Sequence, residues 1–151
     1  MTKQPAGGTP QEATMEILAQ YIKDLSFEAP GARQLFTGQP NIEVHMNVRA
    51  EAVDAEKGEH AVSLDIKASA TANDKAPIFL LELTYTGVFS FQNVPQENLH
   101  LALYVNAPHH LFPFARSILA HLTAENGLPP LLLAPVNFLK LYSESQNASL
   151  N

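Results

Sequence analysis

The segment 78–91, IFLLELTYTGVFSF, constrains the fold more than any other part of the chain. Its side chains alternate with a period of two and include many β-branched and aromatic residues, which is typical of a β-strand. One side is almost wholly apolar and consists of Phe79, Leu81, Leu83, Tyr85, Gly87, Phe89 and Phe91. The other side is mixed and places Leu80 beside Glu82. The strand therefore requires a core on one side and presents a contact surface on the other.

Two further alternating segments precede this strand, at 42–52 and 62–71, with polar turns at 56–59 and 73–75. Short turns between alternating strands predict an antiparallel meander with one buried face. The segment 15–28 is predicted as a fourth strand. Its first part, up to Tyr21, also fits an amphipathic helix.

The pattern changes to a helical period after Pro95. One helical stripe is formed by Leu111, Phe114, Ala115, Ile118, Leu119 and Leu122. Pro113 fits the first turn of this helix and Gly127 its C′ position. A shorter helix is predicted at 99–105, ended by Pro108. Another begins near Pro135 and has Phe138, Leu139 and Tyr142 on its inner side. Strands followed by helices predict an α+β fold, a four-stranded antiparallel sheet with C-terminal helices packed on one face.

The 151 residues predict a single domain with two tails. Residues 1–13 contain two prolines and two glycines and are predicted to be a disordered N-terminal tail. The folded domain is expected to span residues 14–143, and residues 144–151 a flexible C-terminal tail. The segment 30–40 is predicted as a loop. It carries the apolar pair Leu35 and Phe36, which we expect to pack down on the domain or to contact a ligand.

Composition excludes several classes of function. A net charge of −6 disfavours nucleic acid as a partner. The absence of cysteine removes disulfides, thiol catalysis and thiolate metal sites. There is neither an apolar run of about 18 residues nor an N-terminal secretion signal, so we expect a cytoplasmic protein without stable membrane insertion.

Catalytic and metal-binding motifs are not found in the sequence. His109 and His110 are adjacent, and neighbouring residues at a helix start diverge, so they do not predict a shared metal. The serines lack a G-x-S-x-G setting, and Gly7-Gly8 is too isolated to be a phosphate-binding loop. From the residues alone we expect a non-enzymatic domain without metal or cofactor.

Several segments resemble SecB, the bacterial protein-export chaperone family. They are YIKDLSFEAP at 21–30, FLLEL at 79–83, GVFS at 87–90, LFPFAR at 111–116 and LAPVNF at 133–138. The resemblance covers roughly residues 15–142. It implies a four-stranded sheet with helices on one face, paired through sheet edges into dimers and through helices into a homotetramer, a dimer of dimers.

The resemblance also implies a function. SecB-like chaperones hold unfolded preproteins in apolar grooves and deliver them to the ATPase SecA, without using ATP or a cofactor themselves. The SecA-binding positions of the family fall on Asp24, Glu28, Leu80 and Glu82. All four have even parity in their predicted strands, so each pair can lie on the face opposite the core.

The client-binding groove is harder to assign. The family uses the loop after the first strand and the neighbouring helix, which here suggests Leu35, Phe36, Met46 and Leu141. A tryptophan often found in that loop is absent, and Pro40 stands near its place, which leaves the aromatic content of the groove open. Two other readings use the same α+β domain: a small-molecule carrier or enzyme with a cavity between sheet and helix, and a purely structural assembly subunit.

Overall fold

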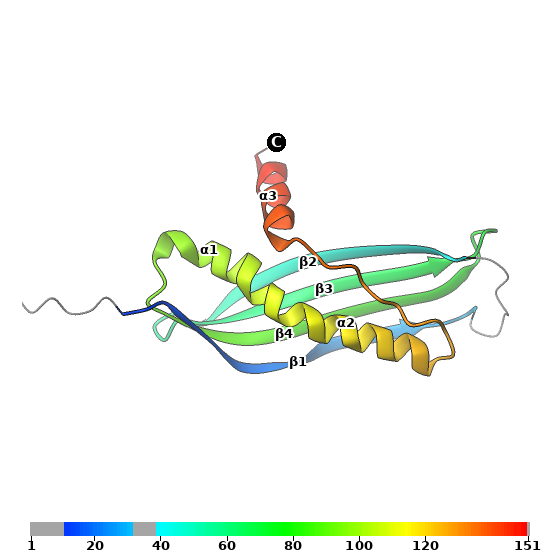
Figure 1. Ribbon diagram of the computed structural model, residues 1–151, viewed down its shortest axis with the longest axis horizontal. Coiled ribbons are helices and arrows are strands. Elements are labelled where there is room, and N and C mark those ends of the chain that lie inside the picture. Colours follow the sequence, from blue (N-terminus) through cyan, green and yellow to red (C-terminus); the bar gives the residue numbers. More distant parts are fainter. Residues whose placement is uncertain (1–10, 32–38, 151) are drawn as a thin grey trace, which may run out of the picture.

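The computed structural model describes residues 11–31 and 39–150, which form the α+β fold that the sequence predicts (Figure 1). The strands are β1 (Thr14–Glu28), β2 (Asn41–Asp54), β3 (Glu59–Thr71) and β4 (Pro77–Gln92). They form one antiparallel sheet in the order β1-β4-β3-β2. Leu35, Phe36 and most of the predicted N-terminal tail lie outside the described residues.

The predicted meander of β2, β3 and β4 is confirmed, and β1 joins it beside β4. Consecutive strands β1 and β2 are therefore the two edges of the sheet. The connection after β1 packs closely on the start of β4: Gly31 donates its N–H to the Ile78 carbonyl at 3.1 Å. A Cβ at Gly31 would lie 2.9 Å from the Ile78 Cα, so only glycine permits this approach. The contact helps to explain why Ile78 is buried although its parity predicts the mixed side.

Strand β1 does not keep a constant period of two, because its register with β4 shifts between Ile17 and Ala19 and again between Ile22 and Asp24. Each shift inserts one extra residue and reverses the side to which the following residues point. Tyr21 therefore pairs with Thr86, while Ile22 pairs with Tyr85. A strict period of two would place Tyr21 on the same side as Ile17 and Leu25, and that expectation is wrong because of the two bulges.

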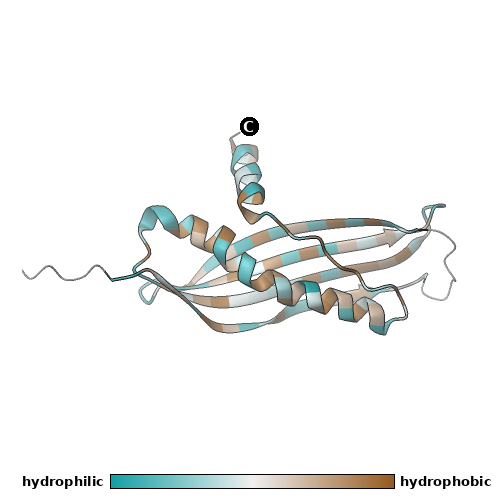
Figure 2. Cartoon of the chain, viewed as in Figure 1, coloured by the Kyte–Doolittle hydropathy of each residue, from teal (hydrophilic) through white to brown (hydrophobic). Residues whose placement is uncertain are grey.

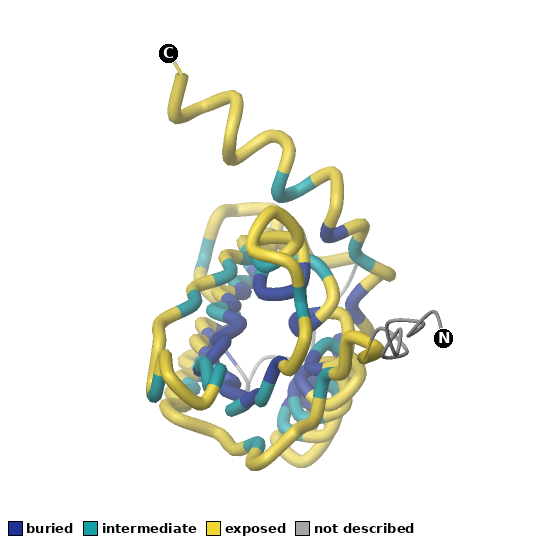
Figure 3. The backbone as a smooth tube through the Cα atoms, turned by 90° about the vertical axis from the view of Figure 1, so that its left-hand side faces the viewer, coloured by how far each residue is buried: buried dark blue, intermediate teal, exposed yellow. Residues whose placement is uncertain are grey.

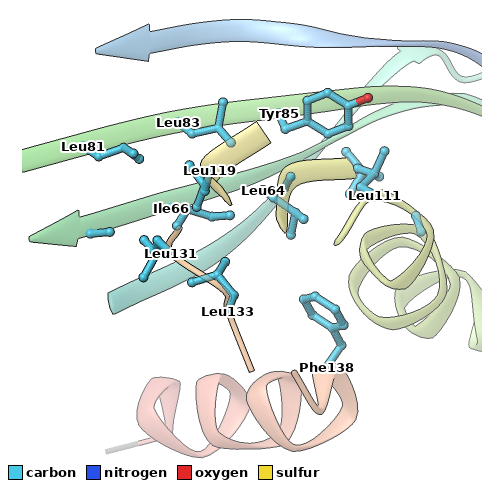
Figure 4. Close-up of a cluster of buried hydrophobic side chains, with 14 of the residues drawn as sticks. Leu64, Ile66, Leu81, Leu83, Tyr85, Leu111, Leu119, Leu131, Leu133 and Phe138 are labelled. Carbon is cyan, nitrogen blue, oxygen red and sulfur yellow. The ribbon is translucent and has the colours of Figure 1, made fainter. Parts of the chain in front are cut away.

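The core lies between the apolar side of β3 and β4 and the long helix that crosses them (Figure 4). Its fully buried members include Leu64 and Ile66 of β3, Leu81 and Leu83 of β4, and Leu111 of the helix. Gly87 lies directly beneath Leu111, since an added Cβ would come within 2.8 Å of the Leu111 Cδ2 atom. A glycine in the middle of a strand thus marks a close approach of helix and sheet.

The long helix begins earlier than predicted. A 3₁₀ turn η1 (Gln96–Asn98) leads into α1 (Leu99–Leu101), the π-helical segment η2 (Ala102–Asn106) and α2 (Ala107–Glu125) without interruption. The predicted break at Pro108 is wrong, because Pro108 lies in the first turn of α2 directly after the π turn, where the missing N–H is tolerated. Pro113, predicted in the first turn, lies inside the helix.

The buried stripe of the helix also differs in part from the prediction. Apart from Pro108, its fully buried members follow a spacing of four residues: Ala107, Leu111, Ala115, Leu119 and Thr123. Ile118 and Leu122 pack only partly against the core. Phe114, predicted as part of the stripe, is exposed, although its ring stacks on Tyr85 at a centroid distance of 6.3 Å.

Helix α2 ends at the glycine cap that the sequence predicts. Gly127 has φ +75°, and its N–H bonds to the Ala124 carbonyl while the Leu128 N–H reaches the Thr123 carbonyl. These two bonds form a Schellman motif. The chain then returns along the sheet as an extended segment, residues 128–137, which we call the strap (Figure 1).

Two side chains of α2 tie the strap to the helix. The Thr123 hydroxyl donates to the Leu119 carbonyl at 2.8 Å and accepts the Leu131 N–H at 2.9 Å. The Arg116 Nε–H donates to the Leu133 carbonyl at 2.8 Å. Leu128, Leu131 and Leu133 are thereby held in the core.

Helix α3 (Phe138–Ser149) begins at Asn137, whose side chain accepts the Lys140 N–H. Phe138 is buried, but Leu139 is exposed, so its predicted place on the inner side is wrong. The helix stands away from the body of the molecule and is mostly exposed (Figure 3). It extends through Ser149, so most of the segment 144–151, expected as a tail, is helical.

The hydroxyl of Thr123 yields a test of the strap. Thr123→Val keeps the shape of the side chain but leaves the buried Leu131 N–H without a partner, which costs about 1–3 kcal/mol. Urea unfolding at fixed protein concentration should show this loss, whereas Thr123→Ser, which keeps the hydroxyl, should lose less. A valine variant as stable as the wild type would show that this bond does not hold the strap.

Candidate functional site: two surfaces of one sheet

The sheet presents two different faces. Helix α2 covers the face that carries Leu81 and Leu83, and the opposite face, here called the outer face, carries Leu80, Glu82 and Thr84. Directly paired residues of antiparallel strands point to the same side, so the register assigns residues of the other strands to each face.

The four predicted SecA-binding residues lie together on the outer face. Glu28 pairs directly with Leu80 in the register of β1 and β4. Asp24 pairs with Thr84, which places it diagonally across from Glu82, a separation of about 7–8 Å between Cα atoms in ideal geometry. We call Asp24, Glu28, Leu80 and Glu82 the acidic patch.

The acidic patch is accessible. Its three carboxylates are exposed, and Leu80, which keeps 37% of its surface exposed, lies at one end of the group beside Glu28 and Glu82. An apolar side chain flanked by carboxylates is a surface that fits a basic partner with an apolar contact point.

The neighbouring part of the outer face is held by ion pairs within the chain. Arg49 makes two hydrogen bonds to the Asp65 carboxylate, one of them 3.0 Å between Nη2 and Oδ1. Thr84 donates its hydroxyl to the same carboxylate at 2.8 Å. The hydrogen bond from Arg49, aided by Thr84 and by the charge of Lys23, lowers the pKa of Asp65 below its usual value, and burial opposes this only in part. Asp65 is thus held ionised and already satisfied.

A shallow depression of about 320 Å³ lies between these groups. Its polar lining comes from all four strands and consists of Asp24, His45, Asn47, Asp65, Lys67, Glu82 and Thr84. The acidic patch therefore borders a recess that can take a side chain from a partner.

A second surface lies at the other side of the sheet, where the strap crosses it. An apolar cavity of about 270 Å³ is formed there by strands and strap together, and we call it the apolar groove. Its lining consists of Pro40, Ile42, Ala70, Ile78, Phe79, Leu128, Pro129, Pro130 and Leu131. The strap is visibly among the most apolar parts of the chain (Figure 2).

The residues predicted for client binding are not gathered in the apolar groove. Leu35 and Phe36 lie outside the described residues. Met46 packs partly against the core, and Leu141 of α3 borders a separate cavity beside Tyr104 and Tyr142. Their role in client binding remains a prediction.

The sequence analysis does not predict the strap as a lining of the groove. The segment has the sequence GLPPLLLAPVNF, residues 127–138. Two adjacent prolines followed by three leucines favour an extended, apolar segment, and such a segment has to lie against an apolar surface. That signal predicts a lining for a groove.

Large apolar side chains are also exposed on the edge strand β1 and on the helix. On β1 they are Ile17, Leu18, Tyr21, Ile22 and Leu25, and on the helix Leu101 and Phe114. An edge strand with such side chains is a template for pairing with another strand.

Within residues 11–31 and 39–150, no three His, Asp or Glu side chains gather as a metal site would require. In the same part of the chain, no helix has the length and apolar character needed to cross a membrane.

Comparison with known proteins identifies relatives along nearly the whole chain. The family described as preprotein translocase subunit SecB matches residues 8–149. A protein-export protein SecB from Hyphomonas neptunium is 42% identical, covering 94% of this chain and 89% of that protein. One from Rhodopseudomonas palustris is 43% identical, covering 95% of this chain and 97% of that protein.

A solved structure shares the fold at much lower identity. It is a SecB-like chaperone from Mycobacterium tuberculosis in complex with a peptide from an antitoxin. The TM-score is 0.66 at 14% identity, and the match covers 81% of this chain and 90% of that chain.

Proposed function

Because the chain belongs to the SecB family and is a preprotein-export chaperone, we propose that it is an ATP-independent holdase that keeps preproteins unfolded in the cytoplasm and delivers them to SecA. The observation that carries the proposal is the separation of two unlike surfaces: the apolar groove under the strap and the acidic patch on the outer face. One fits unfolded chains, and the other fits a folded basic partner.

The apolar groove is suited to hold unfolded polypeptide. Its walls come from β2, β3, β4 and the strap and are lined by aliphatic, aromatic and proline side chains. Burial of apolar area contributes about 25 cal/mol per Å² and is non-directional, so such a groove selects apolar and aromatic segments without strict sequence preference. The peptide bound to the M. tuberculosis SecB-like chaperone supports polypeptide as the ligand.

The acidic patch is suited to dock a basic surface of SecA. Exposed charges in an interface chiefly set the rate of encounter, whereas an apolar residue that becomes buried slows dissociation. Asp24, Glu28 and Glu82 supply the charges, and Leu80 supplies the apolar contact.

We further propose that the chains form a homotetramer, a dimer of dimers, of four 16.5 kDa subunits. The exposed apolar side chains of edge strand β1 support pairing through sheet edges, and those of the helix support packing of dimers. Sedimentation equilibrium measures this mass and is also the assembly control for every variant below.

The apolar groove yields the first functional prediction. Ile42→Asp places a carboxylate in the groove at a position with 47% exposure, which the fold tolerates. Unfolded preprotein would have to desolvate that charge, so its affinity should fall about tenfold. Light scattering of an aggregating preprotein checks the loss of protection.

Val53→Asp is the matched control, since Val53 is an exposed residue of the same strand, about 36 Å from Ile42 along β2. It should protect the preprotein as the wild type does. If Ile42→Asp protects the preprotein as well as Val53→Asp does, the apolar groove is not part of the client site.

The acidic patch yields the second functional prediction. Leu80→Ala should weaken SecA binding about fivefold or more at every salt concentration, because it removes the apolar contact of the patch. Asp24→Lys should weaken it most at low salt, where exposed charges are least screened. Calorimetry against SecA at low and high salt separates the two effects.

Glu56→Lys, in the turn between β2 and β3, makes the same change of charge away from the patch and should bind SecA normally. All three variants should still protect unfolded preproteins. If Asp24→Lys and Leu80→Ala both bind SecA as the wild type does, the docking site lies elsewhere.

A further inference from the structure

The outer face carries cations of its own among its carboxylates. Lys67 of β3 is paired directly with Glu82 of β4 in the sheet register, and its Nζ lies 3.7 Å from the Glu82 Oε1 atom. One strand further, Arg49 is bonded to Asp65. The charge of Lys23 also acts on Asp65.

The carboxylates of the acidic patch are therefore not equivalent. Glu82 has an ion-pair partner in its own chain, whereas Asp24 and Glu28 have none among the described residues. A basic partner therefore meets two carboxylates on β1 that have no ion-pair partner within residues 11–31 and 39–150, and one on β4 that is shared with Lys67.

The Lys67–Glu82 pair is exposed on both sides, with 58% and 51% of the two side chains accessible. An exposed pair of this kind stabilises the fold little, so a partner can displace Lys67 from Glu82. The ammonium group then remains at the border of the interface as a like charge facing a basic surface, which opposes binding.

We propose that Lys67 is a specificity-determining residue of the outer face. It competes with SecA for Glu82 and thereby lowers the affinity of the complex. This inference rests on the proposed docking of SecA at the acidic patch. It also places the boundary of the SecA footprint at β3, since the Asp65 carboxylate of that strand is satisfied by Arg49 and Thr84.

The test is calorimetry of SecA against Lys67→Gln. Removal of the competing charge should tighten binding about two- to fivefold at low salt, the range expected for one exposed charge pair, and much less at high salt. Lys57→Gln is the matched control. Lys57 is also an exposed lysine in a surface ion pair, with Asp54, but it lies beside Gln92, ten residues along β4 from Glu82. It should leave SecA affinity unchanged.

A double-mutant cycle separates competition from a general change of charge. Glu82→Gln should cost more SecA affinity in the Lys67→Gln background than in the wild type, because only there is Glu82 fully available. The thermal unfolding midpoint and protection of unfolded preprotein should be alike in all variants.

Tighter binding by Lys67→Gln with this non-additivity supports the proposal. Unchanged or weaker binding, or additive effects, would overturn it while leaving the docking site intact, provided that Leu80→Ala still weakens the complex. A wild-type chain that does not bind SecA would overturn both the role of Lys67 and the proposed docking at the acidic patch.

Discussion

The structure depends on the burial of one face of the β3–β4 strand pair. Along both strands, alternate side chains are apolar and fully enclosed, and Gly87 lets Leu111 of the helix approach the sheet closely. In the part of the chain that the structure describes, α2 and the strap cover one face of this sheet, and the polar side chains of the other face remain available. The two surfaces to which we assign functions are consequences of this single constraint.

The strap forms the apolar groove together with the sheet that it covers. A helix ending at Gly127 would leave the apolar ends of β3 and β4 without cover. The extended segment fixed by Thr123 and Arg116 fills part of that space, and its prolines and leucines leave an apolar groove beside Ile42 and Phe79. In the proposed function, stability and client binding therefore draw on the same residues, and the hydrogen bonds to the strap support both.

Much of this was predictable from sequence, and the failures have physical causes. The alternation of 78–91 predicts the buried strand, and even parity predicts that Leu80 and Glu82 share a face, as the register confirms. Parity failed at Tyr21 because bulges in β1 depend on pairing with β4, which local pattern does not encode. The break expected at Pro108 failed because a π turn precedes it. The ion pair of Lys67 with Glu82 could not be predicted from the sequence, because its prediction requires knowing which strands are neighbours.

The central claim is that clients and SecA use opposite faces of one sheet, and simultaneous binding tests it most directly. The measurement is calorimetry of SecA against the chain alone and against the chain saturated with an unfolded preprotein. If the apolar groove and the acidic patch are separate, the dissociation constant for SecA will be the same in both titrations, and a ternary complex will co-sediment. Loss of SecA binding upon saturation with the preprotein, or displacement of the preprotein by SecA without ATP, would contradict this account.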